Sequence, residues 1–238
     1  KVTFVTFLLG ENMESVLDML KAKQNTANKL FCKKIIPTNL EILGVSIPEQ
    51  RQIAKEISKQ NWQQFFETEK EDYEEIVTLK GLVLGYAKMD IDLFLQYLEK
   101  FYQKVCSWSN VDVSASSFKI IAKNREKVLP IILKYLNDKN EFKQRLSIVL
   151  LLDYFVTDEY IDFVLEQTKK VSSEKYYANM ALAWLVSVCF VKFRNKTLTL
   201  FEEKCLSKFV QNKAIQKCKD SFRVSKEDKL LLEKFKLK

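Results

Sequence analysis

Turn-forming residues are scarce in this chain, whose 238 residues include only four glycines and three prolines. A β-sandwich or barrel of many short strands needs frequent turns, and glycine and proline supply many of them. The hydrophobic content of 47% is high enough for a sizeable core. The scarcity of turn residues therefore predicts an all-α fold of helices joined by short connections.

Apolar residues recur at helical spacing through most of the chain. Ser46 followed by Pro48 indicates a helix start, and this helix is expected to run to about Ser58. Gly81 and Gly85 lie one turn apart in an amphipathic helix expected over residues 72–88, where they would let a neighbouring helix approach closely. The other expected helices span residues 12–23, 25–36, 91–104, 108–122, 126–137, 141–155, 159–171, 175–191, 198–209, 211–222 and 226–236.

Short connections between these helices imply antiparallel neighbours, stacked as helical hairpins. From Leu93 onward the pairs recur about every 35 to 45 residues, which is the size of HEAT-type repeats. We therefore predict an α-solenoid that forms a single domain over residues 1–238 and is curved, with a basic concave face. An irregular helical globule is the alternative.

Charge is zoned along the chain, which carries a formal net charge of +8. Residues 119–145 hold eight Lys or Arg against three acids, and residues 211–238 hold nine against four. Residues 150–168 hold five acids and no base. A folded array that gathers the basic zones on one side would offer a surface for a polyanion, whereas the simpler interpretation is a set of solvated helix faces.

The chain has no histidine, which removes His-based metal sites, Ser-His-Asp triads and Cys-His dyads. It also lacks a glycine-rich phosphate loop. Its five cysteines are widely spaced and include no CxxC pair, so we expect no disulfide framework and a cytoplasmic protein. No apolar stretch approaches the roughly 20 residues of a membrane span, so we expect no membrane partner.

Trp108 and Asp112 are four residues apart and share one helix face. Arg145 and Trp184 lie in two further helical patterns, so one carboxylate, one guanidinium and two indoles could converge on a single surface. Each residue also has a plainer explanation. Asp112 would be an exposed or N-terminal helix acid, both tryptophans would belong to the core, and Arg145 would pair with Glu141 one turn earlier.

The C-terminal region adds a basic series, Lys213, Lys217, Lys219 and Arg223, spaced for one helix face. Of these, Lys213, Lys217 and Arg223 are our candidates for contact with phosphate, with a solvated face as the alternative. The two tyrosines at residues 176–177 precede the Trp184 helix and are not included in the candidate site.

Several separated motifs of this chain resemble those of the AlkD-like family of DNA alkylation-repair glycosylases, which are built from HEAT-like repeats. They lie at residues 44–51, 108–112, 144–145, 180–184, 212–215 and 221–224. The resemblance extends over residues 44–238, the repeat body, and the N-terminal helices in residues 1–43 diverge from it. Ser107 stands where well-known active relatives have an aromatic residue before the site tryptophan.

The resemblance implies a function for each candidate residue. Relatives release cationic N3- or N7-alkylated purines from double-stranded DNA by hydrolysing the N-glycosidic bond, without a metal or organic cofactor. By analogy, Asp112 would lie beside the deoxyribose, Trp108 and Trp184 would pack against sugar and backbone, and Arg145 would hold phosphate. A monomer that associates with the nucleoid when bound to DNA is expected.

The chemistry of the residues fits this expectation. A cationic alkylpurine is already a good leaving group, so no histidine is needed to protonate it. The sugar becomes oxocarbenium-like as the bond breaks, and a fixed carboxylate such as Asp112 can stabilise that charge or orient water. Two alternatives remain open: a non-catalytic DNA-binding paralogue on the same fold, and a HEAT-like protein-interaction scaffold.

Overall fold

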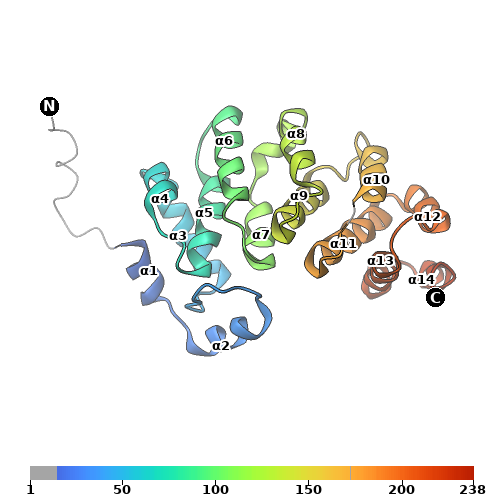
Figure 1. Cartoon of the computed structure of the whole chain (residues 1–238), viewed down its shortest axis with the longest axis horizontal. Coiled ribbons are helices and arrows are strands. Elements are labelled where there is room, and N and C mark those ends of the chain that lie inside the picture. Colours follow the sequence, from blue (N-terminus) through green and yellow to red (C-terminus); the bar gives the residue numbers. More distant parts are fainter. Residues whose placement is uncertain (1–14, 172) are drawn as a thin grey trace.

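The computed structural model describes residues 15–171 and 173–238, which form an all-helical protein without a β-sheet in these ranges (Figure 1). The start of the divergent N-terminal segment, residues 1–14, lies outside the described residues. The helices are α1 (Val16–Ala22), α2 (Thr26–Ile35), α3 (Ile47–Ile57), α4 (Trp62–Thr68), α5 (Glu74–Tyr86), α6 (Ile91–Tyr102), α7 (Trp108–Ala115), the 3-10 helix η1 (Lys119–Lys123), α8 (Arg125–Tyr135), α9 (Glu141–Tyr154), α10 (Ile161–Lys170), α11 (Tyr176–Lys192), α12 (Arg194–Glu203), α13 (Lys208–Asp220) and α14 (Lys226–Glu233).

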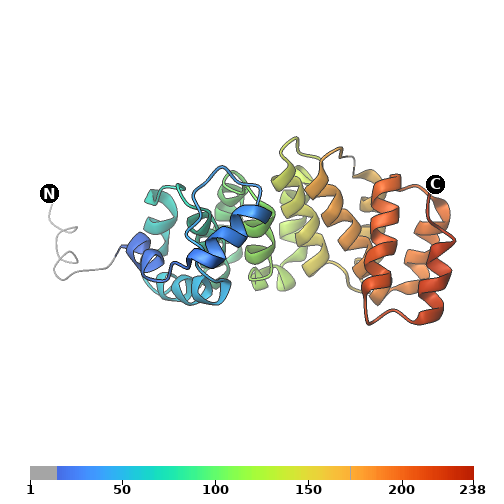
Figure 2. The ribbon, with the colours of Figure 1, turned by 90° about the horizontal axis from the view of Figure 1, so that it is seen from below.

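Two rows of helices form a curved stack (Figure 1). Helices α3, α5, α7, α9, α11 and α13 make the inner row, in which each contacts the next, and α4, α6, α8, α10 and α12 cover it on the outer side. Seen from below, the inner helices lie side by side (Figure 2). From α5 onward they begin at Glu74, Trp108, Glu141, Tyr176 and Lys208, a repeat of 32–35 residues. The predicted α-solenoid is confirmed, with a repeat at or just below the short end of the expected range.

The start of α3 is the one predicted from Ser46 and Pro48. Ser46 is the N-cap residue, Pro48 lies in the first turn, and the Glu49 carboxylate accepts hydrogen bonds from the Ser46 amide at 3.2 Å and the Ser46 hydroxyl at 2.7 Å. This capping box satisfies amides that the first turn leaves without a helical partner.

Helices α5 and α7 pack closely at the two glycines of α5, as their spacing predicts. A β-carbon at Gly81 would overlap the side chain of Ser114, and one at Gly85 would overlap that of Ser117. The backbone of α5 can therefore approach α7 and the turn that follows it only because these positions carry no side chain.

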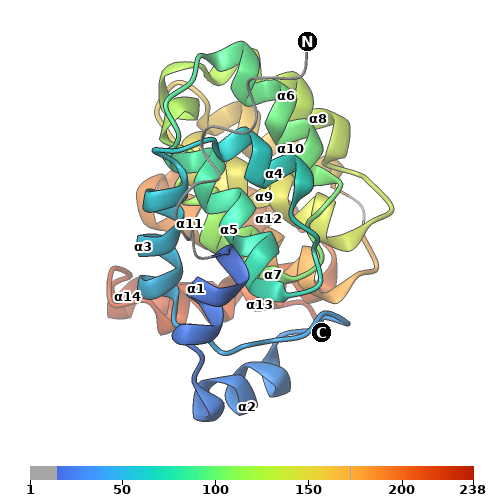
Figure 3. The same cartoon turned by 90° about the vertical axis from the view of Figure 1, so that its left-hand side faces the viewer.

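Helix α2 lies outside both rows, near the inner side of the stack (Figure 3). None of its residues is buried, and Leu30, Phe31 and Ile35 are exposed. The Asn28 side chain donates a 2.9 Å hydrogen bond to the carbonyl of Gly44, whose φ of 83° is one that glycine adopts without strain. This contact fixes the N-terminal half of α2 against the repeat body.

Several helix boundaries differ from those expected. Helix α7 ends at Ala115 rather than near residue 122, because the hydroxyls of Ser116 and Ser117 hydrogen-bond to carbonyls three residues earlier and compete with the helix. Helix α12 spans Arg194–Glu203 rather than residues 198–209, and α13 begins three residues early, at Lys208. The break before α12 is the single non-helical residue Phe193, and neither glycine nor proline marks it.

Helix α4 was missed entirely by the sequence prediction. Asn61 caps it, and Trp62, Phe65 and Phe66 bury its apolar face. The rings of Trp62 and Phe66 pack edge-on against Tyr97, with centroids 4.7 and 5.0 Å away. The spacing of these aromatic residues by three and four was a helical signal in the sequence.

Candidate nucleic-acid interface

Trp108 and Asp112 lie on α7, whose N-terminus is anchored to a buried carboxylate. Ser107 is the N-cap, and its hydroxyl accepts a hydrogen bond from the Asn110 amide at 3.2 Å. The Ser107 hydroxyl and the Asn110 side chain both donate to Glu74, at the start of α5. Burial raises the pKa of Glu74, while the Ser107 hydrogen bond opposes that shift. Ser107, Asn110 and Glu74 thus fix where α7 begins.

Asp112 and Arg145 form an ion pair between α7 and α9. Arg145 donates from Nε to Asp112 Oδ1 at 2.9 Å and from Nη2 to Oδ2 at 2.7 Å, so the guanidinium engages both carboxylate oxygens. The Arg145 side chain is 8% exposed, whereas that of Asp112 is 22% exposed. A fork of this kind fixes the carboxylate in direction as well as in position.

A third donor of Arg145 reaches α11. Nη1 donates to the carbonyl of Tyr177 at 2.6 Å, and the Tyr177 amide donates to the Glu141 carboxylate. Arg145 therefore pairs with Asp112 rather than with Glu141, the partner considered from the local sequence. The guanidinium of Arg145 is nearly buried, and three of its nitrogen atoms donate hydrogen bonds, two of them to Asp112. In this structure Arg145 therefore holds the Asp112 carboxylate in place. Its expected contact with phosphate stays a prediction.

The indoles of Trp108 and Trp184 are both half-buried. Trp108 Nε1 donates a 3.0 Å hydrogen bond to the carbonyl of Ile35, at the end of α2. Trp184 packs against the core and lines a hollow between α11 and α13. The remaining tryptophan, Trp62, is the buried one, at 8% exposed. Burial of both site indoles in the core, which the scaffold alternative expects, is not observed.

The basic residues of α13 extend the same inner wall. Lys217 is half-buried and lines the hollow with Trp184 and Arg223. Its pKa is lowered by burial and then by the neighbouring Arg145 guanidinium, while Asp112 acts in the opposite direction. Lys217 on α13 is therefore close enough to Asp112 and Arg145 to interact electrostatically, and it shares the hollow with Trp184 of α11.

The other members of the basic series differ in their surroundings. Lys213 is exposed, with its ammonium 6.0 Å from the centre of the Phe209 ring. Arg223 is also exposed, in the connection after α13. Lys219 forms an ion pair with Glu233 of α14.

Three features of this wall were not found from the sequence. Lys192 lines the hollow together with the hydroxyl residues Ser187 and Ser221. Lys192 lies eight residues after Trp184, two helical turns along α11, and this spacing was the available signal. The contacts of Glu74 with Ser107 and of Ile35 with Trp108 join residues 33 and 73 positions apart, which no local pattern reveals.

Within residues 15–171 and 173–238, no group of three or more Cys, Asp or Glu side chains is arranged to hold a metal ion. In the same ranges no helix is both long and apolar enough to cross a membrane.

Comparison with known proteins supports the resemblance for the four motifs between residues 44 and 184; the match begins within the N-terminal segment expected to diverge, and the motifs at residues 212–215 and 221–224 lie beyond it. A family model described as DNA alkylation repair enzyme matches residues 16–189, which include α1 to most of α11 and contain Trp108, Asp112, Arg145 and Trp184. A search of curated proteins gave no significant match. The match covers well over half of the chain, and DNA is the substrate that this family implies. The chain belongs to the DNA alkylation repair enzyme family.

Proposed function

We propose that this protein is a DNA glycosylase that hydrolyses the N-glycosidic bond of cationic N3- or N7-alkylated purines. The observation that carries the proposal is the Asp112–Arg145 pair, in which a partly exposed carboxylate is held by a nearly buried guanidinium between α7 and α9. The family match supplies DNA as the substrate. We propose that it acts as a monomer on DNA inside the cell.

Asp112 would act as a fixed negative charge. The bond from C1′ to the purine nitrogen breaks, and its electron pair leaves with the base, which becomes neutral. Positive charge then develops on the deoxyribose, and a preoriented carboxylate stabilises it without having to reorganise. Water adds its oxygen to C1′ and releases a proton to solvent. No acid is required for the leaving group, because the alkylated purine already carries a positive charge.

Arg145 would set the direction of that charge. A carboxylate offers about four lone-pair positions, and the Arg145 fork occupies one on each oxygen of Asp112. The remaining positions can face a sugar or a water molecule. Trp108 and Trp184 would pack against the sugar and backbone on either side, and Lys213, Lys217 and Arg223 would supply positive charge for the phosphates.

One observation favours a second candidate function, DNA binding without base release. Arg145 reaches Asp112 and the Tyr177 carbonyl at once, so the pair would also serve to join three inner helices. In that case the inner wall would bind DNA with an affinity that falls as salt rises, and Asp112 would not affect any chemical step.

A base-release assay separates the two functions. Methylated duplex DNA is incubated with an excess of wild-type protein, the Asp112→Asn variant or the Asp162→Asn variant, and free base is measured over time. Asp162 is the matched control because it is an exposed aspartate paired with Lys196 on the outer row. We expect wild type to release base. For Asp112→Asn we expect a rate at least about 100-fold lower, and for Asp162→Asn an unchanged rate. Absence of release by wild type, beside an active reference glycosylase, would overturn the proposal.

A further inference from the structure

Asp153 is an exposed acid on the inner row of helices, and the proposed chemistry does not use it. It is the last residue but one of α9, eight residues after Arg145. The negative end of the helix dipole lies there and disfavours a carboxylate. In the described part of the chain, Asp153 forms no ion pair or hydrogen bond, whereas Arg145 holds both oxygens of Asp112. No stabilising contact therefore accounts for an acid at this position.

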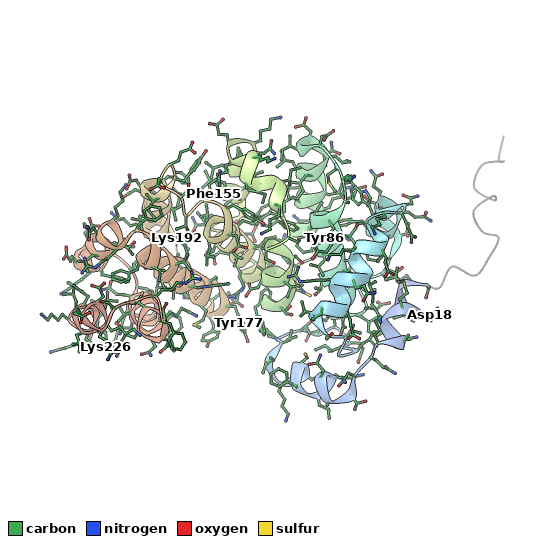
Figure 4. All side chains as sticks on the ribbon, turned by 180° about the vertical axis from the view of Figure 1, so that it is seen from behind. Asp18, Tyr86, Phe155, Tyr177, Lys192 and Lys226 are labelled. Atoms are coloured by element: carbon green, nitrogen blue, oxygen red, sulfur yellow. The ribbon has the colours of Figure 1, made fainter. Side chains whose placement is uncertain are left out.

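Two exposed lysines from neighbouring elements lie beside the end of α9 that carries Asp153. Lys119 of η1 has its ammonium 5.9 Å from the centre of the Tyr154 ring. Lys192, at the end of α11, donates a 3.3 Å hydrogen bond to the carbonyl of Val156. Figure 4, in which Lys192 is labelled, shows this end of α11 beside the end of α9. Neither ammonium bonds to Asp153, and both act on it only electrostatically.

The surroundings of Asp153 act in opposite directions on its pKa. Although the side chain is exposed, the helices of the concave wall replace part of the bulk water around it, which is the largest influence and raises the pKa to about 6. Lys119 lowers the pKa, Asp112 of α7 raises it, and Lys192 lowers it. From α8, Arg125 reaches the same end of α9 through a 2.5 Å hydrogen bond to a backbone carbonyl. Histidine, the side chain that ordinarily titrates in this range, is absent from the chain.

A phosphate attracted by Lys119 and Lys192 would lie beside Asp153 as well. Two like charges at close range favour the protonated form of a carboxyl, which no longer repels the phosphate and can donate a hydrogen bond to it. We propose that Asp153 lowers the affinity of the inner wall for DNA at neutral pH and takes up one proton from solvent when DNA binds. The inference rests on the proposed function, because both need DNA on this wall, but it assigns Asp153 no part in base release.

The affinity for undamaged duplex DNA, measured from about pH 5.5 to about pH 8 at constant ionic strength, tests the inference. Because the bound state holds the extra proton, the affinity rises as the pH falls. For wild type we expect about tenfold weaker binding at the alkaline end of this range than at the acid end. Asp153→Asn, which cannot ionise, should bind at every pH about as tightly as wild type does at the acid end. Asp153→Glu, which keeps a carboxylate, should keep the pH dependence.

Asp162→Asn is the matched control, because Asp162 is an exposed aspartate paired with Lys196 on the outer row. It should keep the affinity and the pH dependence of wild type. Asp153 is exposed too, so its variants should fold like wild type, which circular dichroism can verify.

Calorimetry in two buffers of different ionisation enthalpy measures the proton uptake directly. We expect uptake on DNA binding by wild type and none by Asp153→Asn. Proton uptake and pH dependence that persist unchanged in Asp153→Asn would overturn the inference, even if this variant binds DNA more tightly, because another group would then take up the proton.

The outcomes also separate this inference from the proposed function. Proton uptake through Asp153 in a protein that releases no base would keep the inference and remove the glycosylase. Base release that depends on Asp112, with an affinity for DNA that does not change with pH, would keep the glycosylase and remove the inference. A wild-type protein that binds no DNA would overturn both.

Discussion

Asp112 and Arg145 occupy equivalent places in successive inner helices, since each is the fifth residue of its helix, and the guanidinium of Arg145 grips both oxygens of Asp112. Successive inner helices contact each other along the row. Residues one repeat apart therefore face each other, and a 33-residue separation becomes a direct contact.

The first prediction concerns Arg145→Lys. Lysine keeps the positive charge but cannot form the two-pronged contact, so Asp112 would lose its fixed direction. We expect base release to slow by up to about 100-fold, while the salt dependence of DNA binding stays as in wild type. Single-turnover kinetics and a salt series on undamaged duplex DNA measure the two effects.

Arg194→Lys is the control for that experiment. Arg194 donates from Nε and Nη2 to Asp228, in a pair between α12 and α14, so the same substitution is made away from the inner wall. It should leave base release unchanged. Base release at the wild-type rate in Arg145→Lys would contradict a positioning role for Arg145.

The second prediction concerns the close packing of α5 and α7. Gly81→Ala would gain up to about 1 kcal/mol of helix propensity, but its β-carbon would overlap Ser114 and lie 2.6 Å from Cζ of Phe101. Overpacking of this kind costs about 1–3 kcal/mol, so we expect a net loss of unfolding free energy, measured by urea titration. Ser114→Ala is the control. It removes a buried hydroxyl that has no hydrogen-bond partner among the described residues, so it should cost little. Equal stability of Gly81→Ala and wild type would contradict the close approach.

The third prediction concerns pH and Glu74. Burial raises the pKa of this carboxyl above its ordinary value of 4.5, with Glu75 acting in the same direction and Ser107, Thr38 and Cys106 opposing it. A carboxyl whose pKa is raised by folding stabilises the folded state at low pH, and this contribution is lost as the pH rises through the raised value. We therefore expect Glu74→Gln, which cannot ionise, to gain stability relative to wild type as the pH rises above 4.5. Urea unfolding of both proteins at several pH values measures the difference. A constant difference would show that Glu74 ionises as freely in the folded chain as in the unfolded one.

The fourth prediction concerns the contact between Trp108 and α2. Trp108→Phe removes the indole N–H that donates to the Ile35 carbonyl. One such hydrogen bond contributes about 1 kcal/mol. Helix α2 has no buried residue, and the Asn28–Gly44 hydrogen bond holds its N-terminal half only. We expect faster hydrogen exchange in α2 with little change in global stability. Trp62→Phe should lower global stability and leave hydrogen exchange in α2 unchanged, because Trp62 is in the core beside Tyr97. Unaltered exchange in α2 of the Trp108→Phe variant would show that other contacts hold this helix.

Local sequence signals were enough for the helical class, for the start of α3 at Ser46 and for the close packing at Gly81 and Gly85. Each depends on residues within one or two turns of each other. An N-cap side chain meets amides two or three residues away, an apolar stripe repeats every 3.6 residues, and a missing β-carbon shows directly in the sequence. Such features can be predicted from the sequence because they do not depend on how distant parts of the chain pack.

Other features depended on how the repeats pack against each other. Neither glycine nor proline marks the break at Phe193, and the hollow beside Lys192 is lined by residues of α11 together with the end of α13 and the residues that follow it. Arg145 had a carboxylate available four residues earlier, at Glu141, but an exposed pair at that spacing contributes only about 0.3–0.5 kcal/mol. Asp112 on the next helix offers both oxygens to a guanidinium that packing has nearly removed from water, where such a contact is stronger. The distance along the chain is large, yet the desolvation of the guanidinium makes the distant carboxylate the favoured partner.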